Sequence, residues 1–166
     1  MVIFGRTLHR IKAIISFGSV SACDIGGWIE KEENLSQEGN AWVSGNAWVS
    51  GNALVYGDAR VYGNAWVSGN AEVSGNAEVY GNALVYGDAR VYGNAHLMWI
   101  SKIGSRNDTI TFMRSKELKI IVSAGCFRGT IEEFEEKVKL KHGENEHAQA
   151  YFLAIQLAKL RIDLEE

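Results

Sequence analysis

The sequence contains no proline, and among its 166 residues it has only two cysteines and four histidines. The absence of proline argues against long rigid linkers. Cys23 and Cys126 lie far apart, so we expect free thiols, as in a reducing cytosol, rather than a disulfide. No window approaches the roughly 18 apolar residues that a membrane span needs. We therefore expect a soluble, cytoplasmic protein without membrane contact.

An excess of positive charge is also missing. Lys and Arg number 17 against 20 Asp and Glu, which gives a formal net charge of −3, and no basic segment is hidden in residues 99–166. The composition therefore offers no electrostatic argument for nucleic acid or an anionic membrane. The first 17 residues mix Arg, His and Lys with apolar residues and lack a clear cleavage site, so they do not predict a signal peptide.

Glycine, in contrast, recurs at a fixed interval. Between Gly39 and Met98 a hexad is repeated ten times, with Gly first, Asn or Asp second, Ala third and Val fifth, except for Leu97. Ala and Val stand two residues apart, so on an extended segment they face the same side. We expect that side to be a narrow interior, and we expect Gly-Asn to form corners where positive φ costs little. Three hexads then make one triangular coil of 18 residues, with coils about 4.8 Å apart.

This Ala-x-Val-x-Gly-Asn repeat resembles the hexapeptide repeat of left-handed parallel β-helix proteins. The resemblance implies a mainly β chain with a left-handed parallel β-helix over residues 39–98. That family includes acyltransferases and γ-type carbonic anhydrases, so it specifies the fold far better than the function. The segments around the repeats, such as LHRIKAIISFGSV, GSRNDT and GCFRGT, resemble small hexapeptide-repeat proteins common in phages and prophages. This second resemblance implies a viral or mobile-element setting.

We expect three regions along the chain. Residues 1–38 are predicted to form an N-terminal strand and a capping segment, with Gly27-Trp28-Ile29 as a degenerate early rung. Residues 39–98 are the hexapeptide-repeat β-helix. Residues 99–166 are predicted to form a C-terminal α+β (ββαα) module that flanks or caps the coil, because a bare coil end exposes unpaired strand edges.

The predicted module combines one hairpin and two helices. Residues 109–113 and 119–123 alternate or are β-rich, with a polar turn between them. Thr130 and Glu133 fit a capping box at the start of a first helix that ends near Gly143. A second helix is predicted over about 145–164, with an apolar stripe made of Leu153, Leu157, Leu160 and Leu164.

The outward side chains of the repeats are predicted to stack in columns. The most apolar face carries Trp48, Trp66 and Leu84, with Tyr86 beside them. We expect the C-terminal helix or a sister subunit to cover this face; the alternative is a platform for a ligand or partner. Covering such columns predicts a homo-oligomer, and the family resemblance makes a trimer the default.

Residues suited to catalysis are sparse. Acyltransferases of the resembled family use a His as general base, and the only histidine of the repeats is His96, a weak candidate in the last hexad. No corner loop is inserted in the ten hexads to build such a site. The other histidines, His9, His142 and His147, are scattered, so no metal site is predicted, and no cofactor is expected. Cys126 has no identifiable base nearby, and we expect a buried structural thiol.

The most suggestive polar cluster follows the repeats and consists of Arg106, Asn107, Asp108 and Thr109, with Arg128 and Thr130 further on. Arginine can grip a phosphate or carboxylate in a fork, and the helix start at Gly129-Thr130 offers backbone N–H groups to an anion. These residues are candidates for binding a nucleotide-like ligand. The alternative is that Asn107 and Asp108 only build a turn, and that Arg106 pairs with Asp108 or a helix glutamate.

Three functional hypotheses follow. The first is a non-enzymatic binding protein of phage type, an oligomeric β-helix scaffold that holds a small anionic ligand or a host protein. Such a protein would work in the host cytoplasm, for instance as a counter-defence factor that sequesters a nucleotide signal. The second is an acyltransferase of the hexapeptide class, and the third is a structural or assembly component.

Overall fold

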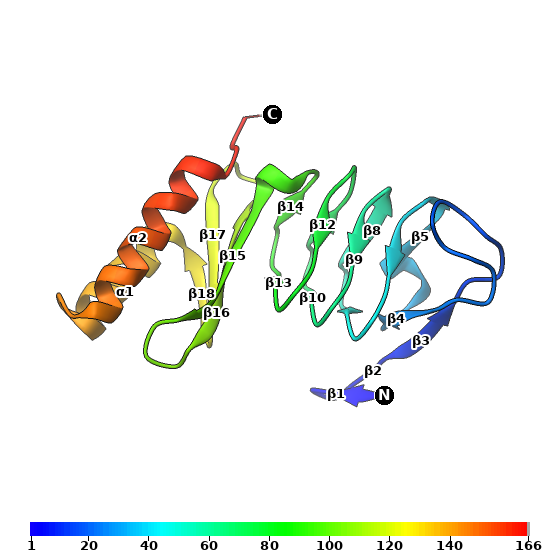
Figure 1. Cartoon of the computed structure of the whole chain (residues 1–166), viewed down its shortest axis with the longest axis horizontal. Helices are drawn as coiled ribbons and strands as arrows, with labels where there is room; N and C mark the ends of the chain where they lie inside the picture. Colours follow the sequence, from blue (N-terminus) through cyan, green and yellow to red (C-terminus); the bar gives the residue numbers. More distant parts are fainter. Residues whose placement is uncertain (166) are drawn as a thin grey trace. The chain divides into compact units, whose positions relative to one another are not determined.

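The computed structural model describes residues 1–165. Its contacts divide the chain into two compact units, Met1–Asn94 and Ala95–Glu166. The first unit consists of short strands stacked coil upon coil, and the second is an antiparallel sheet with two helices on one of its faces (Figure 1). No helix within residues 1–165 is long and apolar enough to cross a bilayer.

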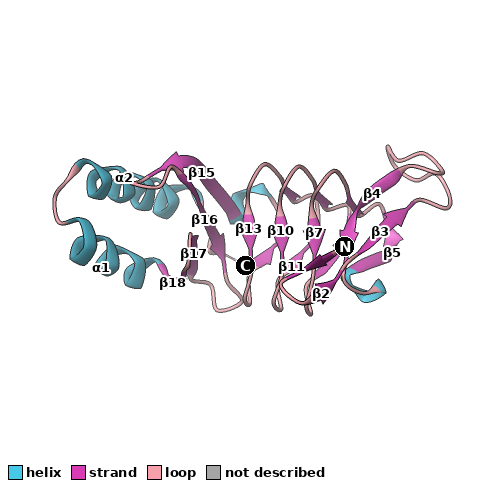
Figure 2. Cartoon of the chain, turned by 90° about the horizontal axis from the view of Figure 1, so that it is seen from below, coloured by secondary structure: helices cyan, strands magenta, loops and turns pink. Residues whose placement is uncertain are grey.

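The first unit is a β-solenoid of about four turns. Equivalent strands of successive coils pair in parallel, and their rows are visible in Figure 2. One row contains β4 (Ile25–Ile29), β7 (Trp48–Val49), β10 (Trp66–Val67) and β13 (Leu84–Val85). The second contains β5 (Leu35–Gly39), β8 (Leu54–Gly57), β11 (Glu72–Val73) and β14 (Arg90–Val91). The third contains β6 (Trp42–Val43), β9 (Arg60–Val61) and β12 (Glu78–Val79).

Alanine and valine of the repeats fill the solenoid interior, as predicted. Every repeat valine from Val43 to Val91 is 0% exposed, and no repeat alanine from Ala41 to Ala89 exceeds 4%. The 18-residue register is also confirmed, because Trp66 lies opposite Trp48 on one side and Leu84 on the other. A slim core of this kind tolerates only small and branched side chains, which explains why the third and fifth positions of the hexad hardly vary.

The start of the chain adds strands to this solenoid. A short hairpin joins β1 (Val2–Ile3) to β2 (Arg6–Thr7), and β3 (His9–Lys12) pairs antiparallel with β4. Trp28 pairs in parallel with Trp48, so the predicted early rung exists. A single turn of 3-10 helix, η1 (Glu32–Asn34), follows, and the buried Asn34 side chain donates hydrogen bonds to the Gly51 and Ala53 carbonyls of the next coil.

The tenth hexad does not form a coil strand, contrary to the prediction. Residues 94–96 form a 3-10 turn, η2 (Asn94–His96), and Leu97 begins a long strand of the second unit. This unit contains β15 (Leu97–Ile103), β16 (Asp108–Arg114), β17 (Ile120–Ala124), β18 (Phe127–Thr130), α1 (Ile131–His142) and α2 (Glu146–Arg161). The expected hairpin is therefore the central pair of a four-stranded sheet, in the order β15-β16-β17-β18. The ββαα prediction missed β15, whose first two residues belong to the last hexad, and β18, which is short and contains a glycine.

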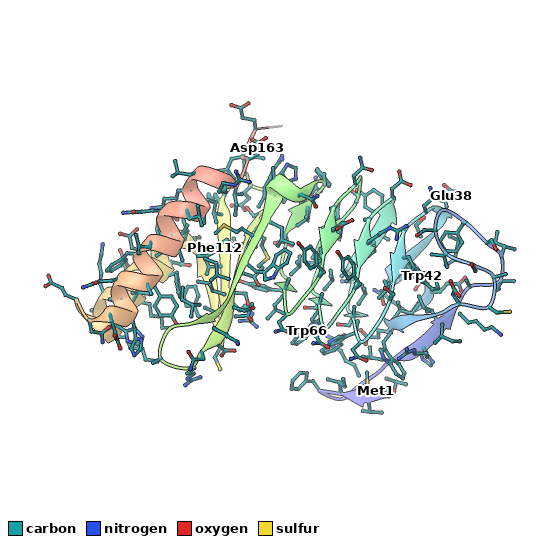
Figure 3. The ribbon with its side chains drawn as sticks, in the orientation of Figure 1. Met1, Glu38, Trp42, Trp66, Phe112 and Asp163 are labelled. Carbon is teal, nitrogen blue, oxygen red and sulfur yellow. The ribbon has the colours of Figure 1, made fainter. Side chains whose placement is uncertain are left out.

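Both helices pack on one face of this sheet. The core contains Phe112, 0% exposed and labelled in Figure 3, together with Ile110, Phe134 and Ile155. The capping box is confirmed: the Thr130 hydroxyl accepts from the Glu133 N–H at 3.3 Å, and the Glu133 carboxylate accepts from the Thr130 N–H at 2.8 Å.

Three of the four leucines in the predicted apolar stripe do not face the core, whereas Leu164, which follows α2, packs partly buried against it. Leu153, Leu157 and Leu160 are exposed, and the buried side of the helix is formed by smaller or branched residues: Ala148, Ala154, Ile155 and Ala158. Alanine lets the helix approach the sheet and α1 closely, so the core of this unit selects the alanine side of α2 over the leucine side.

Candidate functional site

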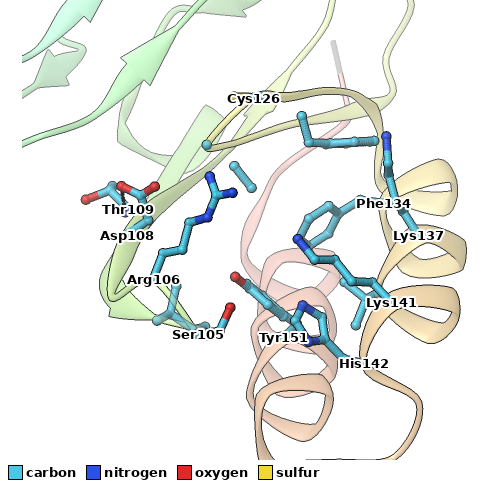
Figure 4. A pocket seen from close by; sticks show the side chains of 15 residues that line it. Ser105, Arg106, Asp108, Thr109, Cys126, Phe134, Lys137, Lys141, His142 and Tyr151 are labelled. Atoms are coloured by element: carbon cyan, nitrogen blue, oxygen red, sulfur yellow. Dashed lines mark hydrogen bonds between the residues drawn. The ribbon is translucent and has the colours of Figure 1, made fainter.

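A cavity of about 230 Å³ lies in the second unit (Figure 4). Its polar groups come from the turn before β16, the start of β16, the turn between β17 and β18, helix α1 and one residue of α2. The residues that line it and carry polar or ionisable groups are Ser105, Arg106, Asp108, Thr109, Cys126, Lys137, Lys141, His142 and Tyr151.

The sheet topology brings these segments together. In an antiparallel sheet of four consecutive strands, the first and third turns lie at the same end of the strands. The turn at 104–107 and the turn at 125–126 are the first and third of this sheet. Helix α1 follows β18 directly and places Phe134, Lys137, Val138 and Lys141 on one side at the spacing of a helical face. The cavity forms where that face meets the two turns.

Three cationic side chains enter the cavity from its two sides. Arg106 extends from the turn, and Lys137 and Lys141 extend from α1 (Figure 4). Within residues 1–165 none of the three makes an ion pair; Lys137 lies over the Phe127 ring, 5.3 Å from its centroid. Asp108 is the only carboxylate of the lining. The cavity therefore carries an excess of positive charge that an anion can balance.

An apolar wall of aromatic rings closes the other side of the cavity. Phe134 contacts Phe127 at 5.1 Å between ring centroids and meets Tyr151 edge-on at 5.4 Å. Burial raises the pKa of the Tyr151 phenol, the Asp108 charge raises it further, and Arg106 opposes that effect. The phenol therefore stays protonated and can donate a hydrogen bond. Gly104 has positive φ, and a Cβ there would collide with the Tyr151 hydroxyl, so only glycine fits beside this ring.

His142 also borders the cavity. Burial lowers the pKa of its imidazole, and the charges of Lys141 and His147 lower it further. His142 is therefore neutral near pH 7 and adds hydrogen-bonding capacity without charge. His147 lies 5.9 Å from it between ring centroids. Within residues 1–165 no group of three or more His, Cys, Asp or Glu side chains is placed to hold a metal ion.

Of the six residues predicted to bind a ligand, three line the cavity: Arg106, Asp108 and Thr109. The predicted alternative of an Arg106 ion pair with Asp108 or a helix glutamate does not occur within residues 1–165. The prediction missed the cavity residues of α1. Their spacing could have indicated them, because it places two lysines beside two apolar residues on one helix face: Phe134, Lys137, Val138 and Lys141.

The other three predicted residues have structural partners elsewhere. Asn107 has φ 51° and its N–H donates to the Gly104 carbonyl, so it builds the turn. Arg128 donates to the carbonyls of Gly125 and Phe127 at 2.7 and 2.6 Å. Thr130 caps α1, and its backbone N–H already donates a hydrogen bond to the Glu133 carboxylate. This N–H is therefore not available to a bound anion.

Two further expectations change with the structure. Cys126, expected to be buried, is exposed and lines the cavity as a free thiol, because it sits in a tight turn at the sheet edge. His96, expected in the last hexad of the coil, lies at the start of the second unit, with Nε2 3.0 Å from Nη1 of Arg114. Burial, and then the Arg114 charge, lower the pKa of His96, whereas Asp163 raises it. His96 does not line the cavity.

The N-terminal hairpin adds an aromatic contact to the apolar column of the solenoid. Trp48 and Trp66 stack with ring centroids 4.2 Å apart, and Phe4 of the N-terminal hairpin stacks on both, at 6.4 and 5.8 Å. Leu84 and Tyr86 belong to the same face, one rung further along. The interface role predicted for these four residues stays a prediction.

Comparison with known families bears on the solenoid alone. Residues 53–69, 59–75 and 77–93 match the model described as the YdcK beta solenoid repeat. These stretches lie within the coils described above. The chain is a β-solenoid repeat protein. A search of the curated proteins finds no match. The family match thus agrees with the solenoid coils and does not extend to the second unit, which holds the cavity.

Proposed function

We propose that this β-solenoid protein is a non-enzymatic binding protein that captures a small anionic ligand in the cavity of its second unit. The observation that carries the proposal is the entry of Arg106, Lys137 and Lys141 into one cavity without an acidic partner for any of them within residues 1–165. Unpaired cations gathered in one concave site favour an anion, because charge-assisted hydrogen bonds are the strongest polar contacts available.

The size and lining of the cavity narrow the ligand class. Its volume of about 230 Å³ corresponds to roughly eight water molecules. The cavity is thus smaller than a pocket that encloses a whole drug-sized ligand, about 300–1,000 Å³. It suits a phosphate or carboxylate attached to one flat ring, with the anion on the cations and the ring against Phe127, Phe134 and Tyr151. A mononucleotide has this chemistry, and Asp108 supplies an acceptor for a donor on its base.

The finer family assignment belongs to this proposal. The Ala-x-Val-x-Gly-Asn hexad supports a left-handed coil of the hexapeptide type, and the segments flanking the repeats support a phage or prophage setting. In that setting, capture of a nucleotide signal in the host cytoplasm would serve as counter-defence. The solenoid would act as a rigid scaffold for an oligomer, since its hexads follow one another without an inserted loop.

A thermal-shift titration tests the proposal. The panel contains inorganic phosphate, pyrophosphate, nucleoside mono- and diphosphates, and cyclic mononucleotides. At least one nucleotide should raise the melting temperature, since a ligand at 100 times its Kd stabilises the folded state by about 2.7 kcal/mol. A panel without any stabilising member would contradict capture of a nucleotide-like anion.

Matched variants separate the cavity from general charge effects. Lys141→Gln and Arg106→Gln each remove one cation of the cavity and should weaken binding about tenfold or more, as expected for loss of a charge-assisted hydrogen bond of about 1.5–3 kcal/mol. Lys116→Gln removes the same charge from an exposed turn outside the lining and should leave Kd unchanged. Equal weakening by all three would point to nonspecific electrostatic attraction.

A further inference from the structure

Helix α2 is apolar on two opposite sides. Its inner side packs on the sheet and α1 through Ala154, Ile155 and Ala158, which are at most 3% exposed. Its outer side carries three leucines at 67%, 44% and 83% exposure: Leu153, Leu157 and Leu160. A helix that is apolar on both sides is typical of a helix buried between two layers. Within residues 1–165 of one chain only the inner layer is present.

The outer leucines have the spacing of a helix-pairing seam. Ala150, Leu153, Leu157 and Leu160 are separated by three, four and three residues, the alternation of a heptad repeat. At 3.6 residues per turn this spacing keeps them in one narrow stripe along the helix. Leu140, 89% exposed in the last turn of α1, adds apolar surface to the helical layer. We call the stripe Ala150, Leu153, Leu157 and Leu160 the outer seam.

The charges at the ends of the seam select its partner. Glu146 lies in the first turn of α2 and Arg161 in the last, and both are exposed. Neither makes an ion pair within residues 1–165. The exposed flanking residues Gln149 and Gln156 are uncharged. A second copy of the helix, laid antiparallel, brings the Glu146 end against the Arg161 end twice and also opposes the two helix dipoles. A parallel copy would place like charges together.

We infer that the outer seam is the interface of a two-fold homodimer in which α2 packs antiparallel on α2 of a second copy. In this register Leu153 of each copy meets Leu157 of the other, and Ala150 meets Leu160, as required for a self-complementary two-fold contact. The contact is independent of the proposed ligand, because Tyr151, the α2 residue of the cavity, points away from the seam into the cavity (Figure 4).

Light scattering coupled to gel filtration of the full chain tests the inference. At micromolar concentration the intact protein should have twice the mass of its 18.3 kDa chain. The double variant Leu153→Gln/Leu160→Gln should be monomeric, with a dissociation constant raised more than about tenfold. Ile14→Gln, which removes an apolar side chain 91% exposed in the first unit, should stay dimeric. Melting curves establish that each variant is folded.

Charge reversal provides a second readout that leaves the leucines intact. Glu146→Lys and Arg161→Glu should each weaken the dimer, and the two together should restore it, because the pair is exchanged between copies. A monomeric intact protein, a trimer, or a dimer indifferent to the leucine changes would overturn the inference. A doubly reversed variant that remains weaker than either single variant would overturn the antiparallel register.

Discussion

Gly69 and Gly87 occupy equivalent corners of the solenoid and offer a direct test of how its coils are held together. Both have positive φ, 74° at Gly69 and 68° at Gly87. A Cβ added at Gly69 would lie 2.7 Å from the backbone nitrogen of Gly87, whereas a Cβ added at Gly87 would meet nothing within 4 Å. The two alanine variants therefore share the backbone cost and differ in the steric cost.

The magnitudes follow from these two costs. An alanine in the left-handed region costs about 1–2 kcal/mol, and we expect Gly87→Ala to lose about that much stability. Gly69→Ala adds a backbone collision that must separate two coils locally, which adds about 1–3 kcal/mol, as for other overpacked sites. The difference arises because Gly69 stacks on the next corner, where Asn70 N–H also donates to the Gly87 carbonyl at 2.9 Å.

Urea denaturation followed by tryptophan fluorescence measures both losses, since Trp48 and Trp66 report on the coil beside each corner. We expect the midpoint of Gly69→Ala to lie well below that of Gly87→Ala, and both below the intact protein. Equal midpoints for the two variants would refute the argument that direct stacking of corner backbones restricts these positions to glycine.

Three further predictions concern other parts of the chain. Phe4→Ala should expose the stacked Trp48 and Trp66 rings and shift their fluorescence to the red, whereas a spectrum unchanged from the intact protein would show that Phe4 does not cover them. Thr130→Ala should cost about 1 kcal/mol in unfolding free energy through loss of the α1 cap, and Thr130→Ser should recover most of it. Burial and Arg114 hold the pKa of His96 below its unfolded value, so the unfolded state binds more protons and stability should fall as pH drops from 7 toward 5. His96→Gln should flatten that fall, measured as melting temperature at both pH values, and the exposed-strand control His9→Gln should not.

The accuracy of the sequence predictions differs between the two units. Among the hexads of the solenoid, paired strands join residues 18 positions apart that occupy the same place in the hexad, as for Trp48 and Trp66. One repeat therefore predicts the interior, the corners and the columns together. The prediction failed at the tenth hexad, where the GNA pattern persists in Gly93-Asn94-Ala95 although the chain turns into β15. In that hexad Leu97 replaces the valine of the fifth position, a change that the prediction treated as a variant of the repeat.

In the second unit, local signals located single elements but not their neighbours. The capping box at Thr130 and the strand alternation of β16 and β17 were predictable because they depend on adjacent residues. The leucine stripe of α2 was predicted as an apolar face, but apolarity alone does not distinguish an inner from an outer face. The alanine side of α2 is buried because small side chains let the helix pack closely on the sheet and α1. The helical periodicity of the sequence does not indicate this choice.

The hexad by itself determined the solenoid, because the same six residues set the corner, the buried pair and the register in every coil. Only the tertiary structure decided where the cavity lies. Arg106 and Lys141 are 35 positions apart and share no motif. They line one cavity because consecutive hairpins place alternate turns at the same end of the strands. Helix α1 follows β18 and runs back toward that end. Such non-periodic contacts depend on the packing of the whole unit, and no local pattern encodes them.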